Sequence, residues 1–195
     1  MSPPPALVTI RRATPDDAPA LGRLHIDVWE DAYTGLMDQS FLDDRRADVE
    51  GRIRRWREIL TEDHGTVLAE AAEGLVGFAG AGPGRDNDLA PGLELYALYV
   101  RAAWWGAGVG HALLRETIGD RAAYLWVLAG NSRAIAFYER QGFRLDGTED
   151  EQDEGLHVRM VRAGGVGGEG AGDEPAEGSG RSGDTEHGLS WGRFG

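Results

Sequence analysis

A glycine-rich segment is the part of this sequence whose residue types point most directly to chemistry. Residues 105–111 read Trp-Gly-Ala-Gly-Val-Gly-His, between a long apolar stretch at 93–100 and a helical pattern at 112–118. Glycines let a backbone approach a ligand closely, and the N–H groups at a helix N-terminus favour an anion. We therefore expect this loop to bind a pyrophosphate. The alternative is a tight turn whose glycines only allow close packing, and the spacing is not that of the dinucleotide fingerprint G-x-G-x-x-G.

The composition excludes several other chemistries. The chain has no cysteine, which rules out disulfides, thiolate zinc sites and a cysteine nucleophile. It also has no lysine, which rules out a Walker phosphate loop and Schiff-base catalysis. The net charge of −13 argues against binding to nucleic acid, and the histidines share no spacing typical of metal ligands. We expect neither nucleic acid nor a metal as a partner.

The chain divides into a globular part and two flanking segments. Residues 163–195 are rich in glycine and acids and poor in apolar residues, so we expect a disordered tail there. Residues 1–6 are expected to be disordered as well, which leaves 7–162 as one domain. No apolar run reaches the roughly 18 residues of a membrane span, and the N-terminus lacks the pattern of a signal peptide. We expect a cytoplasmic protein without membrane contact.

Hydrophobic patterning predicts the elements that must position the glycine loop. A helix should begin after Thr14, where Thr-Pro-Asp-Asp is typical of a helix start. Others are expected at 40–60, 112–118 and 132–140. The strand 93–100 should be buried on both faces, and an acidic loop at 149–154 should separate the last two strands. The predicted strands are 7–11, 66–71, 75–81, 93–100, 124–128, 143–148 and 156–161. This order, β-α-α-β-β-β-α-β-α-β-β, predicts a mixed sheet flanked by helices.

Three segments within this frame resemble the GCN5-related N-acetyltransferase (GNAT) family. Residues 98–110, which read L-Y-V-R-A-A-W-W-G-A-G-V-G, are similar to the family's acetyl-CoA signature, Arg/Gln-x-x-Gly-x-Gly/Ala after a Leu-Tyr-Val strand. Residues 131–143 resemble its second block, Asn…Ala…Phe-Tyr-x-x-x-Gly-Phe, and residues 29–35 resemble the segment between its first two helices. The resemblance covers roughly residues 7–162. Trp105 departs from it, because the family has arginine or glutamine there.

The resemblance implies a fold and an activity. The fold is of the α/β (α+β) class: a mixed, mostly antiparallel sheet of about seven strands, flanked by about four helices and splayed where acetyl-CoA binds. The activity is that of an acyltransferase, which moves an acetyl group from acetyl-CoA to a primary amine by direct attack in a ternary complex, without a metal. Family members are commonly dimers, so a monomer or a homodimer is expected.

The resemblance also implies a cofactor site. The backbone of the Leu-Tyr-Val strand would pair with the pantetheine arm, and the glycine loop would hold the pyrophosphate. Asn131 would bond to the arm, although capping of the following helix explains this residue equally well. The residues implied to bind acetyl-CoA are Leu98, Tyr99, Val100, Trp105, Gly106, Ala107, Gly108, Val109, Gly110, His111, Asn131 and Tyr138.

Two residues are expected to transfer protons. An alkylammonium has a pKa of about 10 and must lose a proton before it attacks. Glu94 is the sole carboxylate in the strand 93–100, and family members often carry a catalytic glutamate there; alternatively, it lies at an exposed strand start. Tyr138 matches the family's tyrosine that often protonates the leaving thiolate; alternatively, its ring only packs on the sheet.

The acceptor amine is less defined by the sequence. Trp29, Tyr33 and Tyr96 are candidates for the walls of its pocket, and the acceptor would be a small-molecule amine or a protein or peptide amine. Two other functions stay open at this point. One is a catalytically weak acetyl-CoA-binding sensor of the same fold, and the other is a nucleotide- or phosphate-binding domain that uses the same loop.

Overall fold

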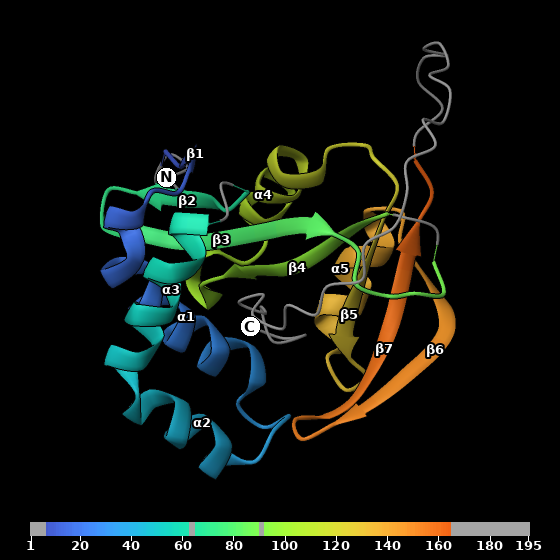
Figure 1. The fold of residues 1–195 in the computed structure, drawn as a ribbon, viewed down its shortest axis with the longest axis horizontal. Coiled ribbons are helices and arrows are strands. Elements are labelled where there is room, and N and C mark those ends of the chain that lie inside the picture. Colours follow the sequence, from blue (N-terminus) through green and yellow to red (C-terminus); the bar gives the residue numbers. More distant parts are fainter. Residues whose placement is uncertain (1–6, 63–64, 90–91, 165–195) are drawn as a thin grey trace, which may run out of the picture.

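The computed structural model describes residues 7–62, 65–89 and 92–164. The predictions for 1–6 and for the tail lie outside these residues, apart from Ala163 and Gly164. Seven strands form one sheet in the order β1-β2-β3-β4-β5-β7-β6 (Figure 1). Neighbours are antiparallel except for β4 and β5, which run parallel. The mixed, mostly antiparallel sheet is therefore confirmed. The strands are β1 (Thr9–Arg12), β2 (Val67–Ala71), β3 (Gly74–Pro83), β4 (Leu93–Val100), β5 (Ala123–Leu128), β6 (Arg144–Gln152) and β7 (Gly155–Arg162).

Five α-helices occur in the described part of the chain, where about four were expected. The prediction of one helix over 40–60 is wrong, because Asp48 has φ −105° and ψ 53°, outside the helical region. Its carboxylate accepts a hydrogen bond of 2.9 Å from the Gly51 N–H, which satisfies a free donor in the first turn of the next helix. The helices are α1 (Ala18–Tyr33), α2 (Gln39–Ala47), α3 (Val49–Glu62), α4 (Val109–Ile118) and α5 (Ser132–Arg140).

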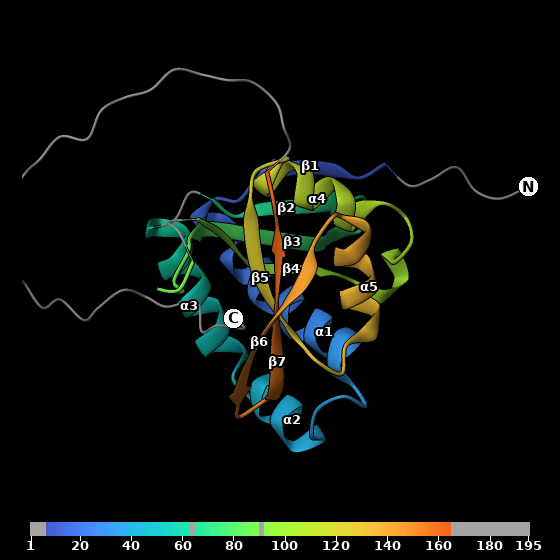
Figure 2. The ribbon, with the colours of Figure 1, turned by 90° about the vertical axis from the view of Figure 1, so that its right-hand side faces the viewer.

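The helices cover the two faces of the sheet separately. On one face, α1, α2 and α3 bury Leu68, Phe78 and Leu128 of the strands. On the other, α4 and α5 pack over Leu125 and Met160. Figure 2 shows the β6–β7 hairpin between α5 on one side and α3 on the other. The alternating side chains of each strand supply both cores, as expected for a sheet covered on two faces.

The sheet opens between its two parallel strands. Only Leu93 with Ala123 and Glu94 with Tyr124 are paired between β4 and β5, and the rest of both strands diverges. The pairing of β3 with β4 also shifts between Gly80 and Ala81, which leaves Tyr96 as an extra residue that bends β4, as β-bulges do. The second half of β4 is only partly buried, so burial on both faces was predicted wrongly for it.

The last hairpin is tighter than predicted. β6 continues to Gln152 and β7 begins at Gly155, so most of the expected acidic loop belongs to β6. Its acids alternate between exposed and half-buried positions, which lets a charged segment remain in an edge strand. Among the described residues, no helix has both the length and the apolar character needed to span a membrane.

Candidate active site

A cavity of about 460 Å³ fills the opening between β4 and β5. Its floor is the second half of β4, and α5 and the glycine loop form two of its walls. The end of α1 closes it through Ala32 and Tyr33. The second half of β4 pairs with β3 but not with β5. Its backbone N–H and C=O groups on the β5 side therefore face the cavity rather than a neighbouring strand.

Most residues predicted to bind a cofactor meet in this cavity. Ala107 is the exception, because its side chain does not belong to the lining. The lining includes Leu98, Tyr99, Val100, Trp105, Gly106, Gly108, Val109, Gly110, His111, Asn131 and Tyr138.

The glycine loop has the backbone geometry that the sequence suggests. Gly106 and Gly108 have φ of +77° and +84°, and a Cβ at either position would meet nothing within 4 Å. Glycine is therefore required by the left-handed backbone, not by crowding. Gly108 precedes α4, whose first N–H groups have no partner within the helix and whose N-terminus carries partial positive charge. A Cβ on Gly110 would lie 3.3 Å from the Phe137 ring, so this glycine allows α4 and α5 to approach.

Trp105 leans back onto the end of β4. Its indole N–H donates to the Val100 carbonyl at 2.7 Å, and the Arg133 guanidinium lies 3.3 Å from its ring centroid. Arg133 also lines the cavity, and partial desolvation lowers its pKa. The sequence reasoning did not single out Arg133, although it lies in the family's second block.

Asn131 is the N-cap of α5. Its side-chain oxygen accepts a hydrogen bond from the Ala134 N–H at 3.1 Å, which is the capping role that was left open. The residue is 5% exposed and also lines the cavity. Its bond to a pantetheine arm stays a prediction.

The tyrosines differ in what their hydroxyls do. Tyr33 and Tyr99 bond to each other at 2.9 Å. Tyr96 donates to the Pro83 carbonyl at 2.6 Å, and Tyr124 donates to Glu94 at 2.9 Å. Tyr138 lines the cavity, and its hydroxyl has no hydrogen-bond partner within the described residues. Burial raises the pKa of Tyr138, so the phenol stays protonated at neutral pH.

Glu94 is buried outside the cavity lining. Its side chain is 2% exposed, which contradicts the alternative of an exposed strand start. Arg85 binds the carboxylate with two side-chain bonds, of 2.9 Å from Nε and 2.6 Å from Nη2. Tyr124 donates to the same carboxylate. Desolvation is the main cause that raises the pKa of Tyr124 to about 12, and the hydrogen bond to Glu94 contributes as well. The structure therefore does not bring Glu94 into the cavity with Tyr138, and its role as base stays a prediction.

Two of the three residues predicted to contact the acceptor amine line the cavity, and one does not. Tyr33 and Tyr96 line the cavity. Trp29 does not: it is 3% exposed in the core beneath α1, and the guanidinium of Arg45 lies 4.0 Å from its ring centroid. Trp126, which the sequence reasoning missed, lines the cavity from β5. Its signal was a second large aromatic side chain, besides Tyr124, in a short strand that is otherwise aliphatic.

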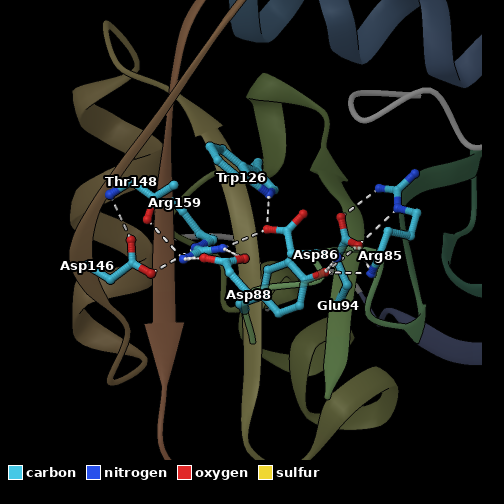
Figure 3. A network of polar contacts seen from close by, with 9 residues as sticks. Arg85, Asp86, Asp88, Glu94, Trp126, Asp146, Thr148 and Arg159 are labelled. Atoms are coloured by element: carbon cyan, nitrogen blue, oxygen red, sulfur yellow. Dashed lines mark hydrogen bonds and ion pairs between the residues drawn. The ribbon is translucent and has the colours of Figure 1, made fainter. Parts of the chain in front are cut away.

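A polar network behind Trp126 fixes that wall. The Trp126 indole N–H donates to Asp86 at 3.0 Å. The same Asp86 oxygen accepts a bond of 2.9 Å from Arg159, which also pairs with Asp88 at 2.7 Å and Asp146 at 2.8 Å. Figure 3 shows these side chains converging from three strands and the β3–β4 loop. The described residues contain no group of three His, Asp or Glu placed to hold a metal ion.

Comparisons with known proteins agree with this architecture. The acetyltransferase (GNAT) domain family matches residues 62–145. An aminoglycoside N(6′)-acetyltransferase type 1 of Stenotrophomonas maltophilia is 34% identical over 158 residues, which cover 78% of this chain and 92% of that protein. The crystal structure of the PaiA N-acetyltransferase from Thermoplasma acidophilum, in complex with coenzyme A, has a TM-score of 0.60 at 21% identity, covering 78% of this chain and 98% of that one.

A further solved structure of similar fold is named for a protein substrate. The ribosomal-protein-alanine N-acetyltransferase from Brucella melitensis has a TM-score of 0.54 at 26% identity and covers 80% of this chain and 99% of that one. This chain belongs to the GNAT family of acetyltransferases. It is an acyltransferase of the N-acetyltransferase type, as the sequence resemblance implied.

Proposed function

We propose that this protein transfers an acetyl group from acetyl-CoA to a primary amine by direct attack of the amine on the thioester carbonyl. The observation that carries the proposal is the Tyr138 hydroxyl: Tyr138 lines the cavity and its hydroxyl has no hydrogen-bond partner among the described residues, while the other four tyrosine hydroxyls are each hydrogen-bonded to a protein group. A neutral phenol placed there can donate its proton to the sulfur as the C–S bond breaks.

The cavity fits acetyl-CoA in its other features. The unpaired edge of β4 at Leu98–Val100 offers N–H and C=O groups to the amides of a pantetheine arm, in the way that a peptide adds to a sheet edge. The loop from Gly106 to His111 offers N–H groups and the positive end of α4 to a pyrophosphate. The coenzyme A complex of the Thermoplasma acidophilum structure supports this assignment for a protein of the same fold.

We propose that the attacking amine binds against Tyr33, Tyr96 and Trp126, which line the cavity. We propose Glu94 as the group that takes up the ammonium proton, acting through water because its carboxylate lies outside the lining. Arg85 and Tyr124 keep that carboxylate in one orientation. The aromatic wall suits a cation, which an aromatic face attracts.

Release of free CoA thiol tests the proposal. The full-length chain is incubated with acetyl-CoA and a panel of polyamines, aminoglycosides, amino acids, peptides with free N-termini and lysyl peptides. We expect amine-dependent thiol release for one class and acetylation of its amine by mass spectrometry. Binding of acetyl-CoA without turnover across the panel would instead support the sensor function. Stabilisation by ATP but not by acetyl-CoA would support the phosphate-binding alternative.

A further inference from the structure

Trp105 and Arg133 form one unit in the cavity lining. They come from different elements: Trp105 is the first residue of the glycine-rich segment 105–111, and Arg133 lies in the first turn of α5. The guanidinium lies 3.3 Å from the indole centroid, within the range of a cation–π contact. Trp105 is itself held by its bond to the Val100 carbonyl, so it is a fixed platform for the cation.

No carboxylate among the described residues pairs with the cation of Arg133. In the part of the chain that the structure describes, Arg133 forms no ion pair and no hydrogen bond, whereas Arg85, Arg101 and Arg159 each bind carboxylates. Asp31 acts on Arg133 only from a distance, and it is already bonded to Arg101 at 2.9 Å. Stacking therefore fixes the position of Arg133 and leaves its N–H donors available.

The surroundings of this cation suit an anion. Its platform adjoins Gly106, which lines the cavity in a left-handed conformation, in the loop that leads into the N-terminus of α4. An arginine fork binds phosphate oxygens with paired, charge-assisted hydrogen bonds. The family has an arginine or glutamine at position 105, where this chain has tryptophan.

We propose that Arg133, seated on Trp105, binds a phosphate group of acetyl-CoA and so supplies the side-chain donor that position 105 lacks. This inference rests on the proposed function. It makes the Trp105–Arg133 pair a determinant of cofactor affinity, acting together with the backbone of the glycine loop.

Three forms of the co-substrate test the proposal on the full-length protein. Dissociation constants are measured for acetyl-CoA, for 3′-dephospho-acetyl-CoA and for S-acetylpantetheine, which has no phosphate, with the wild type and with Arg133→Met. The loss of one charge-assisted contact should weaken acetyl-CoA binding about tenfold. S-acetylpantetheine should bind both proteins equally.

The dephospho form identifies which phosphate is involved. If Arg133 contacts the pyrophosphate, Arg133→Met weakens binding of acetyl-CoA and of the dephospho form alike. If it contacts the 3′-phosphate, only acetyl-CoA binding is weakened. An equal loss for all three compounds, or no loss for any, overturns the proposal. Failure of the wild type to bind acetyl-CoA would instead refute the proposed function itself.

Two further variants separate charge from structure. Arg115→Met removes an arginine from α4 that does not line the cavity, and it should leave all three dissociation constants unchanged. Trp105→Arg, made in the Arg133→Met background, places a cation at the position where the family has one. It should restore most of the acetyl-CoA affinity, and a double variant no better than Arg133→Met would count against the proposal.

Discussion

The hydroxyl oxygens of Tyr33 and Tyr99 lie 2.9 Å apart, in a hydrogen bond that ties the end of α1 to β4 at the cavity wall. Burial raises the pKa of both phenols, so the pair is neutral, with one hydroxyl donating to the other. Tyr138, in the same cavity, has no such partner among the described residues. This contrast separates a structural pair from a hydroxyl that is available for chemistry.

Tyr138→Phe should lower kcat about a hundredfold, because general acid catalysis typically contributes that much or more. The affinity for acetyl-CoA and the melting temperature should stay close to those of the wild type, since no protein hydrogen bond is lost. Steady-state kinetics, calorimetric binding and thermal denaturation measure the three quantities. An unchanged kcat would refute the role of Tyr138.

Tyr99→Phe is the matched control for that variant. It also removes one phenolic hydroxyl from the cavity, but it leaves the buried Tyr33 hydroxyl without a partner. We expect the free energy of unfolding to fall by about 1 kcal/mol. The two variants should therefore differ in which property they change, stability for Tyr99 and turnover for Tyr138.

The sequence predicted the order of the strands along the chain and the position of the glycine loop, because both depend on local signals. Periodic apolar residues define the strands, and alternating glycines allow the left-handed backbone at Gly106 and Gly108. The break at Asp48 was missed because the apolar pattern of α2 and α3 continues across it. A single nonhelical residue leaves little trace in such a pattern.

The candidate site was predicted less completely than the fold, because its members meet only through tertiary structure. Trp126 and Arg133 reach the cavity because β5 diverges from β4, which no local pattern reports. Glu94 was expected at the reacting amine because it is a lone acid in an apolar strand. The charge has a local explanation: Arg85, in the loop before β4, binds it.

Gly108→Ala should weaken acetyl-CoA binding. The residue has φ +84° with open space at the Cβ position, so the cost is backbone strain of about 1 kcal/mol. Relief of the strain would turn the N–H groups of the loop, and the new methyl would occupy space proposed for the cofactor. Gly35→Ala is the control, with φ +83° and equally open space outside the cavity lining. Both variants should lose similar stability, and equal acetyl-CoA affinities would contradict the role of the loop.

Glu94→Gln should destabilise the protein and alter its pH–rate profile. Arg85 would lose its buried carboxylate partner, which costs about 2 kcal/mol in the free energy of unfolding. If Glu94 accepts the ammonium proton, kcat at neutral pH should fall about a hundredfold and should recover as the pH approaches the amine pKa of about 10, where the amine is already neutral. Arg85→Met is the control, because it disrupts the ion pair but keeps the carboxylate, so it should lose stability and keep most of the turnover. A kcat in Glu94→Gln equal to that of the wild type would assign the proton to another acceptor.

Acid should break the ion pair between Arg11 in β1 and Asp17, and so destabilise the protein. Arg11 holds the pKa of Asp17 at about 2, below the ordinary 3.8, by a bond of 2.7 Å. Since the folded-state pKa is lowered, this stabilisation is complete above 3.8 and is lost as the pH falls through about 2. Asp17→Asn should cost about 1 kcal/mol at neutral pH, allowing for solvent screening. Urea denaturation should show that the wild type and Asp17→Asn have the same free energy of unfolding in strong acid. A difference that stays constant with pH would contradict the ion pair.

Arg159→Met should both destabilise the protein and raise the KM of the acceptor amine. The Arg159 and Asp86 side chains are each 4% exposed, so removing the cation leaves a buried carboxylate that is bonded to Trp126 but not neutralised. Loss of one partner of a buried ion pair lowers the free energy of unfolding by about 3 kcal/mol. The control is Arg11→Met. Arg11 bonds two acids where Arg159 bonds three, but its side chain is 34% exposed and lies in an edge strand of the sheet, so the variant should cost about 1 kcal/mol or less. Only Arg159→Met should loosen Trp126 and raise the acceptor KM, with acetyl-CoA affinity unchanged. A loss of stability without any change in that KM would remove Trp126 from the acceptor site.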